Sequence, residues 1–333
     1  MCRWRYSLGV VALFFTPLTA IFAQETSCIH RTLPVTVMDS SGRVIHGLLP
    51  SDFSVRIHGR PATVLSVSLD KRPHRTVVLL DASGSMVDRP LKGRPWELAL
   101  KIASDIAESN SENAPLALII YSDKVHEQVD FAQGTPEVRT RLKAISADPT
   151  YVKNNIKGST TATFDAMLAA LRLLGASDSS DSIYLISDGV DNQSRFKSKD
   201  VSRALGLRSV RMYVSLFESS TEGFGKVGEE ASIEAMTKLT IDSGGLIIGP
   251  LGRNSPNGTK YDITNDQHKA LTVALASVHG AMTDDELLQI ELPQAIQKWE
   301  RVSLELSADK KALHKYLVIA YPKELAPCNV LSH

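Results

Sequence analysis

The stretch Val77–Met86 has the sequence VVLLDASGSM, and it decides the fold class of this chain. Four apolar residues form a continuous run, which is typical of a strand buried on both faces. The run leads directly into a carboxylate at Asp81 and hydroxyls at Ser83 and Ser85. A surface turn requires polar residues, but it does not require three oxygen ligands at alternate positions. The stretch therefore predicts a core strand whose carboxyl end supplies ligands to a binding site.

Strands of the same kind recur along the chain after Arg75, with helical patterns between them. One of these helical patterns contains Leu98, Ile102 and Ile106, which recur every fourth residue and predict an amphipathic helix. This alternation predicts an α/β fold with a doubly wound, mostly parallel, Rossmann-like sheet. The predicted strands are TVVLLD, LALIIYS, SIYLISD, VRMYVSLF and GLIIGP.

Both ends of the mature chain show shorter, alternating strands bounded by Gly, Pro and Ser. Residues 30–72 predict a small β unit, and residues 283–333 predict a C-terminal β tail. Residues 73–282 between them form the predicted α/β domain. The N-terminal unit is too short to bury a sizeable core alone, so we expect the tail to pack on it.

Charge and composition exclude some functions. The chain has 333 residues with 37 basic and 37 acidic ones, so no global field attracts nucleic acid or an acidic membrane. A basic stripe with interleaved aromatic residues, typical of nucleic-acid binding, is also missing from the sequence. We therefore expect neither a nucleic-acid partner nor a membrane span in the mature chain.

The first 23 residues are typical of a secretory signal peptide. Arg3 and Arg5 precede a short apolar run that ends at the small residue Ala23. The run is shorter than the ~20 apolar residues of a spanning helix, and Pro17 interrupts it. We therefore expect an exported protein, whether periplasmic, cell-surface or secreted. A lipoprotein is an alternative, but Glu25 lies where an apolar residue should precede the lipidated Cys28.

Two further segments add oxygen ligands to the first. Asp188 follows another core strand in IYLISDG, and Thr161 lies in the hydroxyl-rich loop GSTTATFDAM. Ligands of doubly wound sheets bind at the carboxyl ends of the strands, so we expect these residues to converge there. Oxygen ligands without His or Cys predict a hard cation, Mg²⁺ first, with Mn²⁺ or Ca²⁺ as alternatives.

The five ligand positions carry a resemblance to a known family. The pattern Asp-x-Ser-x-Ser, a later Thr and a later Asp resembles the metal-ion-dependent adhesion site (MIDAS) of von Willebrand factor type A domains. The segment before the domain also resembles that of an exported family described chiefly from Acidobacteria. This second resemblance rests on Asp39, Gly42, Gly47, Leu48, Asp52 and Phe53.

The resemblance implies a ligand arrangement and a kind of partner. Ser83, Ser85 and Thr161 would bind the metal directly, while Asp81 and Asp188 would act largely through water. Neutral direct ligands leave the cation poorly neutralised, so it would capture a carboxylate of a partner protein. This implies metal-dependent adhesion or assembly, without catalysis. The family pattern does not fix the role of Asp191.

Other interpretations stay open for single residues. Ser83 and Ser85 have the composition of a simple turn, and Thr160, Thr161 or Thr163 could cap a helix. Asp165 lies where the first turn of a helix is expected, and its charge there would complement the helix dipole. This interpretation is favoured over a role as a metal ligand.

Two other functions remain possible for the site. In the first, the metal stabilises the fold of the domain and has no part in binding a partner. Hydrolysis ranks lower, because DASGS lacks the first glycine of a nucleophile elbow and no phosphate-cradling loop is present.

The cysteines predict one disulfide. Cys2 leaves with the signal peptide, so Cys28 and Cys328 remain as an even pair in an exported protein. Domain termini often lie close together, which makes a Cys28–Cys328 bridge feasible. Two unbridged thiols in terminal tails are the alternative.

Overall fold

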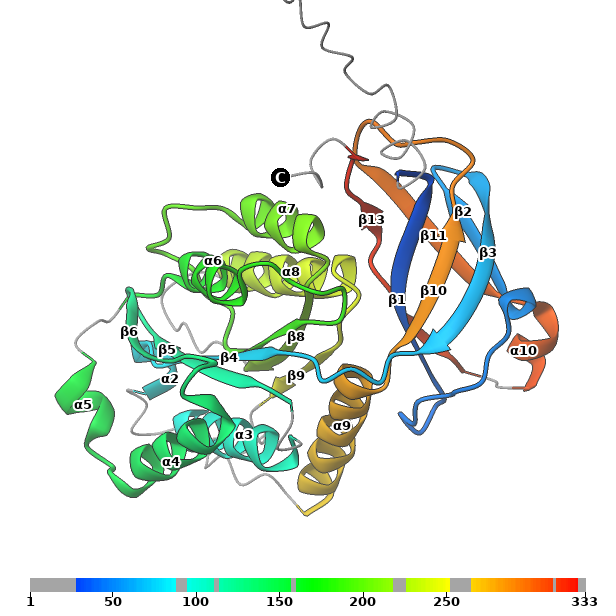
Figure 1. Cartoon of the computed structure of the whole chain (residues 1–333). Coiled ribbons are helices and arrows are strands. Elements are labelled where there is room, and N and C mark those ends of the chain that lie inside the picture. Colours follow the sequence, from blue (N-terminus) through cyan, green and yellow to red (C-terminus); the bar gives the residue numbers. More distant parts are fainter. Residues whose placement is uncertain are drawn as a thin grey trace, which may run out of the picture.

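A computed structural model describes residues 28–87, 95–110, 114–156, 160–217, 226–251, 265–313 and 316–328. The predicted signal peptide, residues 1–23, lies outside these ranges. The described residues form two domains that lie side by side (Figure 1). We name them the α/β domain, residues 76–283, and the β domain, which combines the residues before Thr76 with those after Thr283. This arrangement confirms the predicted fold class.

The α/β domain is built on a six-stranded sheet with the order β6-β5-β4-β7-β8-β9. Five of its strands are parallel, and the edge strand β6 runs antiparallel to β5. The sequence analysis did not predict β6, because its residues VHEQV are short and mostly polar. The strands are β4 Thr76–Asp81, β5 Leu116–Tyr121, β6 Val125–Val129, β7 Ser182–Ser187, β8 Arg211–Phe217 and β9 Ile247–Leu251.

Helices cover both faces of this sheet. Successive residues of β4 point to opposite faces, so Val78 and Leu80 pack with α3, α4 and α9. Val77 and Leu79 pack with α6, α7 and α8 on the other face. Full burial of a Val or Leu side chain stabilises by about 1.5–3 kcal/mol, so the apolar run holds β4 at the centre. The helices are α2 Gly84–Val87, α3 Pro95–Ser109, α4 Gly134–Ala147, α5 Tyr151–Asn155, α6 Thr163–Leu174, α7 Ser198–Arg208, α8 Lys226–Asp242 and α9 Asn265–Thr283.

The β domain joins the two ends of the chain in one antiparallel sheet of order β12-β1-β10-β3-β2-β11-β13. The C-terminal strand β10 lies between β1 and β3, and β11 pairs with β2. A short helix, α10 Ala308–Leu313, follows β11 within the predicted C-terminal β tail. The other elements are β1 His30–Met38, the 3-10 turn η1 Pro50–Asp52, β2 Phe53–Ile57, β3 Arg60–Leu69, β10 Glu286–Glu291, β11 Glu300–Leu306, β12 Val318–Ala320 and β13 Glu324–Leu325.

A buried ion pair joins the two domains. Arg211, at the start of β8, is fully buried and forms a salt bridge with Asp285, which lies just before β10. Its guanidinium also donates to the Thr36 hydroxyl of β1 at 2.9 Å and to the Gly244 carbonyl at 2.6 Å. The first residues of the parallel strands therefore face the β domain, and their carboxyl ends point away from it (Figure 1).

The two remaining cysteines lie at neighbouring positions in the β domain. The Sγ atom of Cys328 lies 3.4 Å from the backbone oxygen of Cys28. Arg31 donates to the same sulfur at 3.2 Å. The structure contains no bond between the two sulfurs, and the disulfide stays a prediction.

Candidate metal-binding site

The candidate site lies where the strand order of the parallel sheet reverses. From β4, the chain builds β5 on one side and later returns to place β7 on the other side. Such a switch point leaves a crevice beyond the carboxyl ends of the two strands. Asp81 ends β4 and Asp188 directly follows β7, so both predicted carboxylates reach this crevice.

Asp81 organises the loop that follows β4. Its side chain is fully buried, and its Oδ1 accepts a hydrogen bond from the Ser83 amide at 2.8 Å. This bond turns the chain sharply, so that the next residues begin the short helix α2. The turn also places the Ser83 and Ser85 hydroxyls 3.1 Å apart. Two of the three hydroxyl ligands predicted from sequence are therefore neighbours.

The loop after β7 is bonded directly to Asp81. The Ser187 hydroxyl donates to Asp81 Oδ2 at 2.5 Å and accepts from the Gly189 amide at 2.9 Å. Gly189 has a φ of 75°, a left-handed conformation that glycine adopts without strain. Asp188 is 1% exposed, and its Oδ1 accepts from the Val190 amide at 3.2 Å. Ser187 therefore couples the positions of the two carboxylates.

The third predicted segment is held by its backbone. The Thr161 amide donates to the Asn192 side chain at 2.8 Å, and its carbonyl accepts from the amides of Asn192 and Gln193, both at 3.0 Å. Thr161 is 2% exposed, yet among its contacts with described residues its hydroxyl makes no hydrogen bond. The Thr163 hydroxyl instead donates to the Val190 carbonyl at 2.8 Å. Thr161 thus has a hydroxyl available to a ligand, and Thr163 does not.

Two neighbouring aspartates have structural partners. Asp191, whose role the sequence left open, accepts from the Phe164 amide at 3.0 Å and so caps the first turn of α6. Asp165 accepts from the Arg195 and Phe196 amides at 3.1 and 3.2 Å. Both carboxylates therefore fix the loop after β7 against α6.

The electrostatics of the site follow from burial of like charges. Burial, followed by the neighbouring charge of Asp188, raises the pKa of Asp81 from 3.8 to about 7. The hydrogen bonds from Ser187 and Ser83 oppose this rise but do not cancel it. A bound cation would favour the ionised form of both carboxylates, because opposite charges attract strongly in a buried site.

The donor set fits a hard divalent cation. Every side-chain donor is an oxygen, and two are carboxylates, which is what Mg²⁺ prefers. Within the described ranges, no three His, Cys, Asp or Glu side chains gather as a soft or all-acidic metal site would require. A metal would therefore depend on the hydroxyls of Ser83, Ser85 and Thr161 together with Asp81 and Asp188.

Sequence reasoning missed two residues that shape this site. Ser187 is a buried strand residue, and its composition alone does not distinguish it from a packing residue. Asn192 has a weak signal, since it follows Asp188 in the polar loop DGVDNQS. Both act through contacts with residues 31 or 106 positions away, which no local pattern reports.

A serine–histidine pair also lies near this edge of the sheet. The Ser122 hydroxyl, just after β5, lies 2.7 Å from His126 Nε2. The same nitrogen lies 2.9 Å from Asp123 Oδ1. A nucleophilic triad uses both ring nitrogens, one toward the serine and one toward the acid. Here one nitrogen contacts both groups, so the geometry does not match that arrangement.

Comparison with known proteins identifies the central part of the chain. Residues 76–190 match the family described as von Willebrand factor type A domain. The chain therefore contains such a domain, and the matched segment includes all five predicted ligand positions. No curated protein matches the chain.

The solved structures that match this chain come from several organisms. A conserved hypothetical protein, BatB from Bacteroides thetaiotaomicron, is 16% identical with a TM-score of 0.41, covering 62% of this chain and 98% of that chain. A von Willebrand factor type A protein from Catenulispora acidiphila is 12% identical with a TM-score of 0.40, covering 85% and 74%. Proximal thread matrix protein 1 from the mussel byssus, with a zinc-occupied MIDAS motif, is 13% identical with a TM-score of 0.45, covering 66% and 49%.

The length and composition of the described helices bear on whether they can cross a membrane. None of the helices in the described ranges combines the length and apolar character that crossing a bilayer requires.

Proposed function

We propose that this von Willebrand factor type A domain is a metal-dependent binding module that captures a carboxylate of a partner protein. The observation that supports this most is the burial of Asp81 and Asp188 at the switch point of the sheet, where the loop after Asp81 also carries the neighbouring hydroxyls of Ser83 and Ser85. Mg²⁺ is the proposed ion, with Mn²⁺ or Ca²⁺ as alternatives.

The residues of the chain have separate tasks in this proposal. Ser83, Ser85 and Thr161 would offer neutral oxygens to the ion, and Asp81 and Asp188 would offer negative charge. A cation held mainly by neutral oxygens supplies a positive charge that attracts one more anionic oxygen. The Ser187 hydroxyl holds Asp81 by a hydrogen bond. This bond limits how far the carboxylate can move toward the ion. The chain itself needs no proton transfer or nucleophile for this task, so we propose binding without catalysis.

A purely stabilising metal is the second candidate. The raised pKa of Asp81 shows that burying the two aspartates together is unfavourable without a counter-charge. A cation could relieve this cost and have no partner at all. The two candidates differ only in whether a partner is lost when the metal is removed.

The export of the protein belongs to the same proposal. The signal-peptide composition of residues 1–23 supports a periplasmic, cell-surface or secreted location, where a disulfide between Cys28 and Cys328 could form. The resemblance of the segment before the domain to an exported family supports the same location. The intact mass of the mature protein before and after reduction tests the bridge. Two thiols that titrate in the unreduced, denatured protein would exclude it.

A binding experiment with two proteins tests the function. The wild type and the Asp81→Asn variant are used to capture partners from the native extracellular fraction, with Mg²⁺ and with chelator. We expect a partner that the wild type retains only with Mg²⁺ and that the variant does not retain. Circular dichroism in chelator shows whether the fold is intact. A folded wild type that captures the same proteins with and without Mg²⁺ would contradict metal-dependent recognition.

A further inference from the structure

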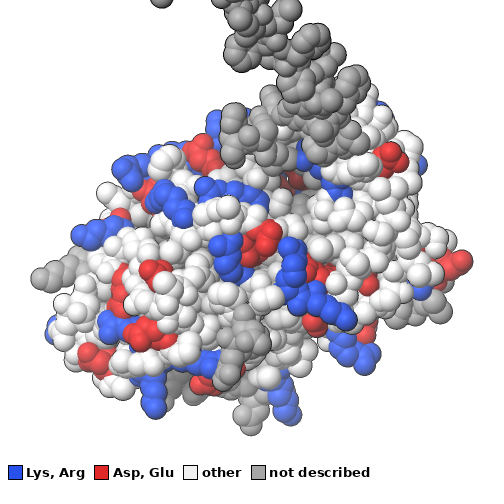
Figure 2. Space-filling model, viewed as in Figure 1, with Lys and Arg blue, Asp and Glu red and all other residues white. Residues whose placement is uncertain are grey.

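One segment next to the metal-binding site differs in charge from the chain as a whole. The chain has equal numbers of basic and acidic residues, but residues 191–208 contain five basic and two acidic ones. Figure 2 shows several Lys and Arg side chains over α7 and the loop that leads into it. We name four exposed members the basic strip: Arg195, Lys197, Lys199 and Arg203.

The basic strip begins at the metal-binding site. Asn192 and Gln193, which hold Thr161 through its backbone, precede Arg195 in the chain by three and two residues. From there α7 runs toward the β domain, where a Cβ atom on Gly206 would lie 2.7 Å from the Trp299 ring. The basic strip therefore extends from the metal-binding edge along α7 toward the domain interface (Figure 1).

The charges of the basic strip are only partly compensated. Arg195 is 83% exposed and pairs with Asp165 at 3.3 Å. Lys197, Lys199 and Arg203 form no ion pair with any described residue. Asp200, the acidic residue among them, uses its carboxylate to accept the Lys197 amide at the start of α7.

The placement of these charges is unfavourable for the helix alone. Lys197 and Lys199 lie at the N-terminus of α7, where the helix dipole is positive and disfavours cations. Lys199 and Arg203 are four residues apart on one face, where like charges repel. Helix stability therefore does not explain the basic strip, and a negatively charged partner would offset both effects.

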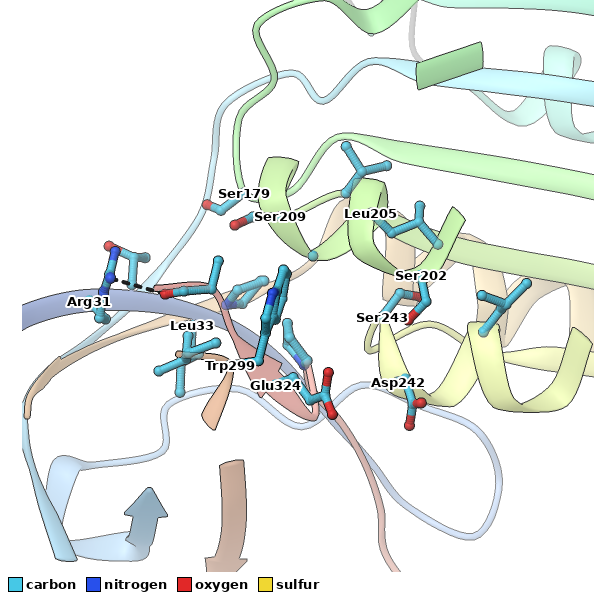
Figure 3. A pocket seen from close by; sticks show the side chains of 18 of the residues that line it. Arg31, Leu33, Ser179, Ser202, Leu205, Ser209, Asp242, Ser243, Trp299 and Glu324 are labelled. Atoms are coloured by element: carbon cyan, nitrogen blue, oxygen red, sulfur yellow. Dashed lines mark hydrogen bonds between the residues drawn. The ribbon is translucent and has the colours of Figure 1, made fainter. Parts of the chain in front are cut away.

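A groove beside α7 lies at the end of the basic strip. Lys199 and Arg203 line a groove of about 400 Å³ between α7 and α8, and Trp299 and Glu324 of the β domain also line it. Figure 3 shows the adjoining pocket, which is lined by Glu324 of β13 and by Asp242, the last residue of α8. Asp242 is paired with Lys238, whereas Glu324 places a negative charge in the groove. The surface most favourable to an acidic ligand therefore lies between the metal-binding site and Arg203.

We propose that the partner segment is acidic and extended, with one carboxylate at the metal and further carboxylates on Lys197, Lys199 and Arg203. This inference rests on the proposed function, because the metal anchors the segment. Complementary charge on an exposed surface contributes mainly to specificity and to the rate of association. The basic strip would thus distinguish an acidic segment from a single exposed carboxylate.

A defined peptide tests the inference. The probe is fluorescein-labelled decaglutamate, which spans up to about 33 Å when extended, and its anisotropy is measured at low salt with Mg²⁺. The test variant is Lys197→Gln, Lys199→Gln and Arg203→Gln combined. The matched control is Arg56→Gln, Lys71→Gln and Lys143→Gln, three exposed positions away from the basic strip.

We expect the test variant to bind decaglutamate about tenfold more weakly than the control variant. The rise in melting temperature with Mg²⁺ should be the same in both, which shows that the metal-binding site is intact. Added salt should weaken the wild type more than the test variant. Equal affinities of the test and control variants would overturn the inference.

The chelator arm separates this inference from the proposed function. If chelator releases the peptide from the wild type, the metal anchor is supported. If chelator has no effect while the test variant still binds weakly, the basic strip acts alone and both the anchor and the proposed function are wrong.

Discussion

Two buried charged clusters lie at opposite edges of the same parallel sheet, and they differ in the charge of the groups that face each other. At the edge facing the β domain, Arg211 and Asp285 pair with each other, and the Thr36 hydroxyl and the Gly244 carbonyl add further hydrogen bonds to the pair. At the opposite edge, Asp81 and Asp188 carry the same charge, and the hydrogen-bond partners of Asp81 are neutral. An oppositely charged buried pair holds two domains in contact, whereas a like-charged buried pair is unfavourable and would be stabilised by a bound cation.

The first prediction addresses the compensated cluster and has the largest expected effect. Arg211→Met leaves Asp285 buried without its cation, which should lower the free energy of unfolding by about 3–5 kcal/mol. Urea denaturation of the purified protein measures this loss. The double variant Arg211→Met, Asp285→Leu is the control and should recover most of it, because an apolar pair needs no charge compensation. A loss below about 1 kcal/mol in the single variant would show that the ion pair does not hold the domains together.

The second prediction addresses the like-charged cluster. Asp81→Asn should abolish the stabilisation by Mg²⁺, which is about 2.7 kcal/mol for the wild type at a concentration 100 times the Kd. Asparagine still accepts a hydrogen bond at this buried position, so the variant should remain folded in chelator. Thermal melts of both proteins with and without Mg²⁺ measure the difference. A variant that responds to Mg²⁺ as the wild type does would remove Asp81 from the site.

A third prediction concerns a buried acid beside the compensated cluster. Burial raises the pKa of Glu286, although the Gly47 and Leu48 amides and His46 oppose the rise and Asp52 adds to it. A raised pKa in the folded state means that this group contributes most to stability below its unfolded pKa. Its contribution is lost as the pH rises through the folded value.

Glu286→Gln does not titrate, so its stability relative to the wild type should increase with pH from 4 to 8. The gain should be about 1.4 kcal/mol for each unit by which the pKa is raised. Urea denaturation at several pH values measures this trend. A difference that is constant with pH would mean that Glu286 titrates normally.

The smallest effects should separate two threonines of the metal-binding edge. Thr163→Ala removes the hydrogen bond to the Val190 carbonyl, so it should cost about 1 kcal/mol of stability with or without Mg²⁺. Thr161→Ala removes a hydroxyl that makes no hydrogen bond with the described residues, so it should cost little in chelator and reduce the Mg²⁺ effect. Thr160→Ala is the control and should change neither quantity. Equal losses in all three variants would indicate helix capping instead of metal binding.

The site was predictable where its chemistry is local. Asp81, Ser83 and Ser85 follow one apolar run, and the alternate spacing in that run is visible without any tertiary contact. Thr161 could not be distinguished from Thr160 and Thr163 by sequence, because all three lie in one hydroxyl-rich loop. In the structure, the hydrogen bond from Thr163 to Val190 engages the Thr163 hydroxyl, and the backbone bonds with Asn192 attach Thr161 to the loop after β7.

By itself, the sequence determined the alternation of strands and helices, the β character of both chain ends and the residue types at the carboxyl ends of β4 and β7. These properties depend on period, composition and neighbouring residues, which a linear chain displays directly. The tertiary structure alone decided that Ser187 holds Asp81, that Asp191 caps α6 and that Arg211 joins the two domains. Each of these roles depends on residues that are distant in the chain, 106 positions in the case of Asp81 and Ser187, and meet only when the sheet forms.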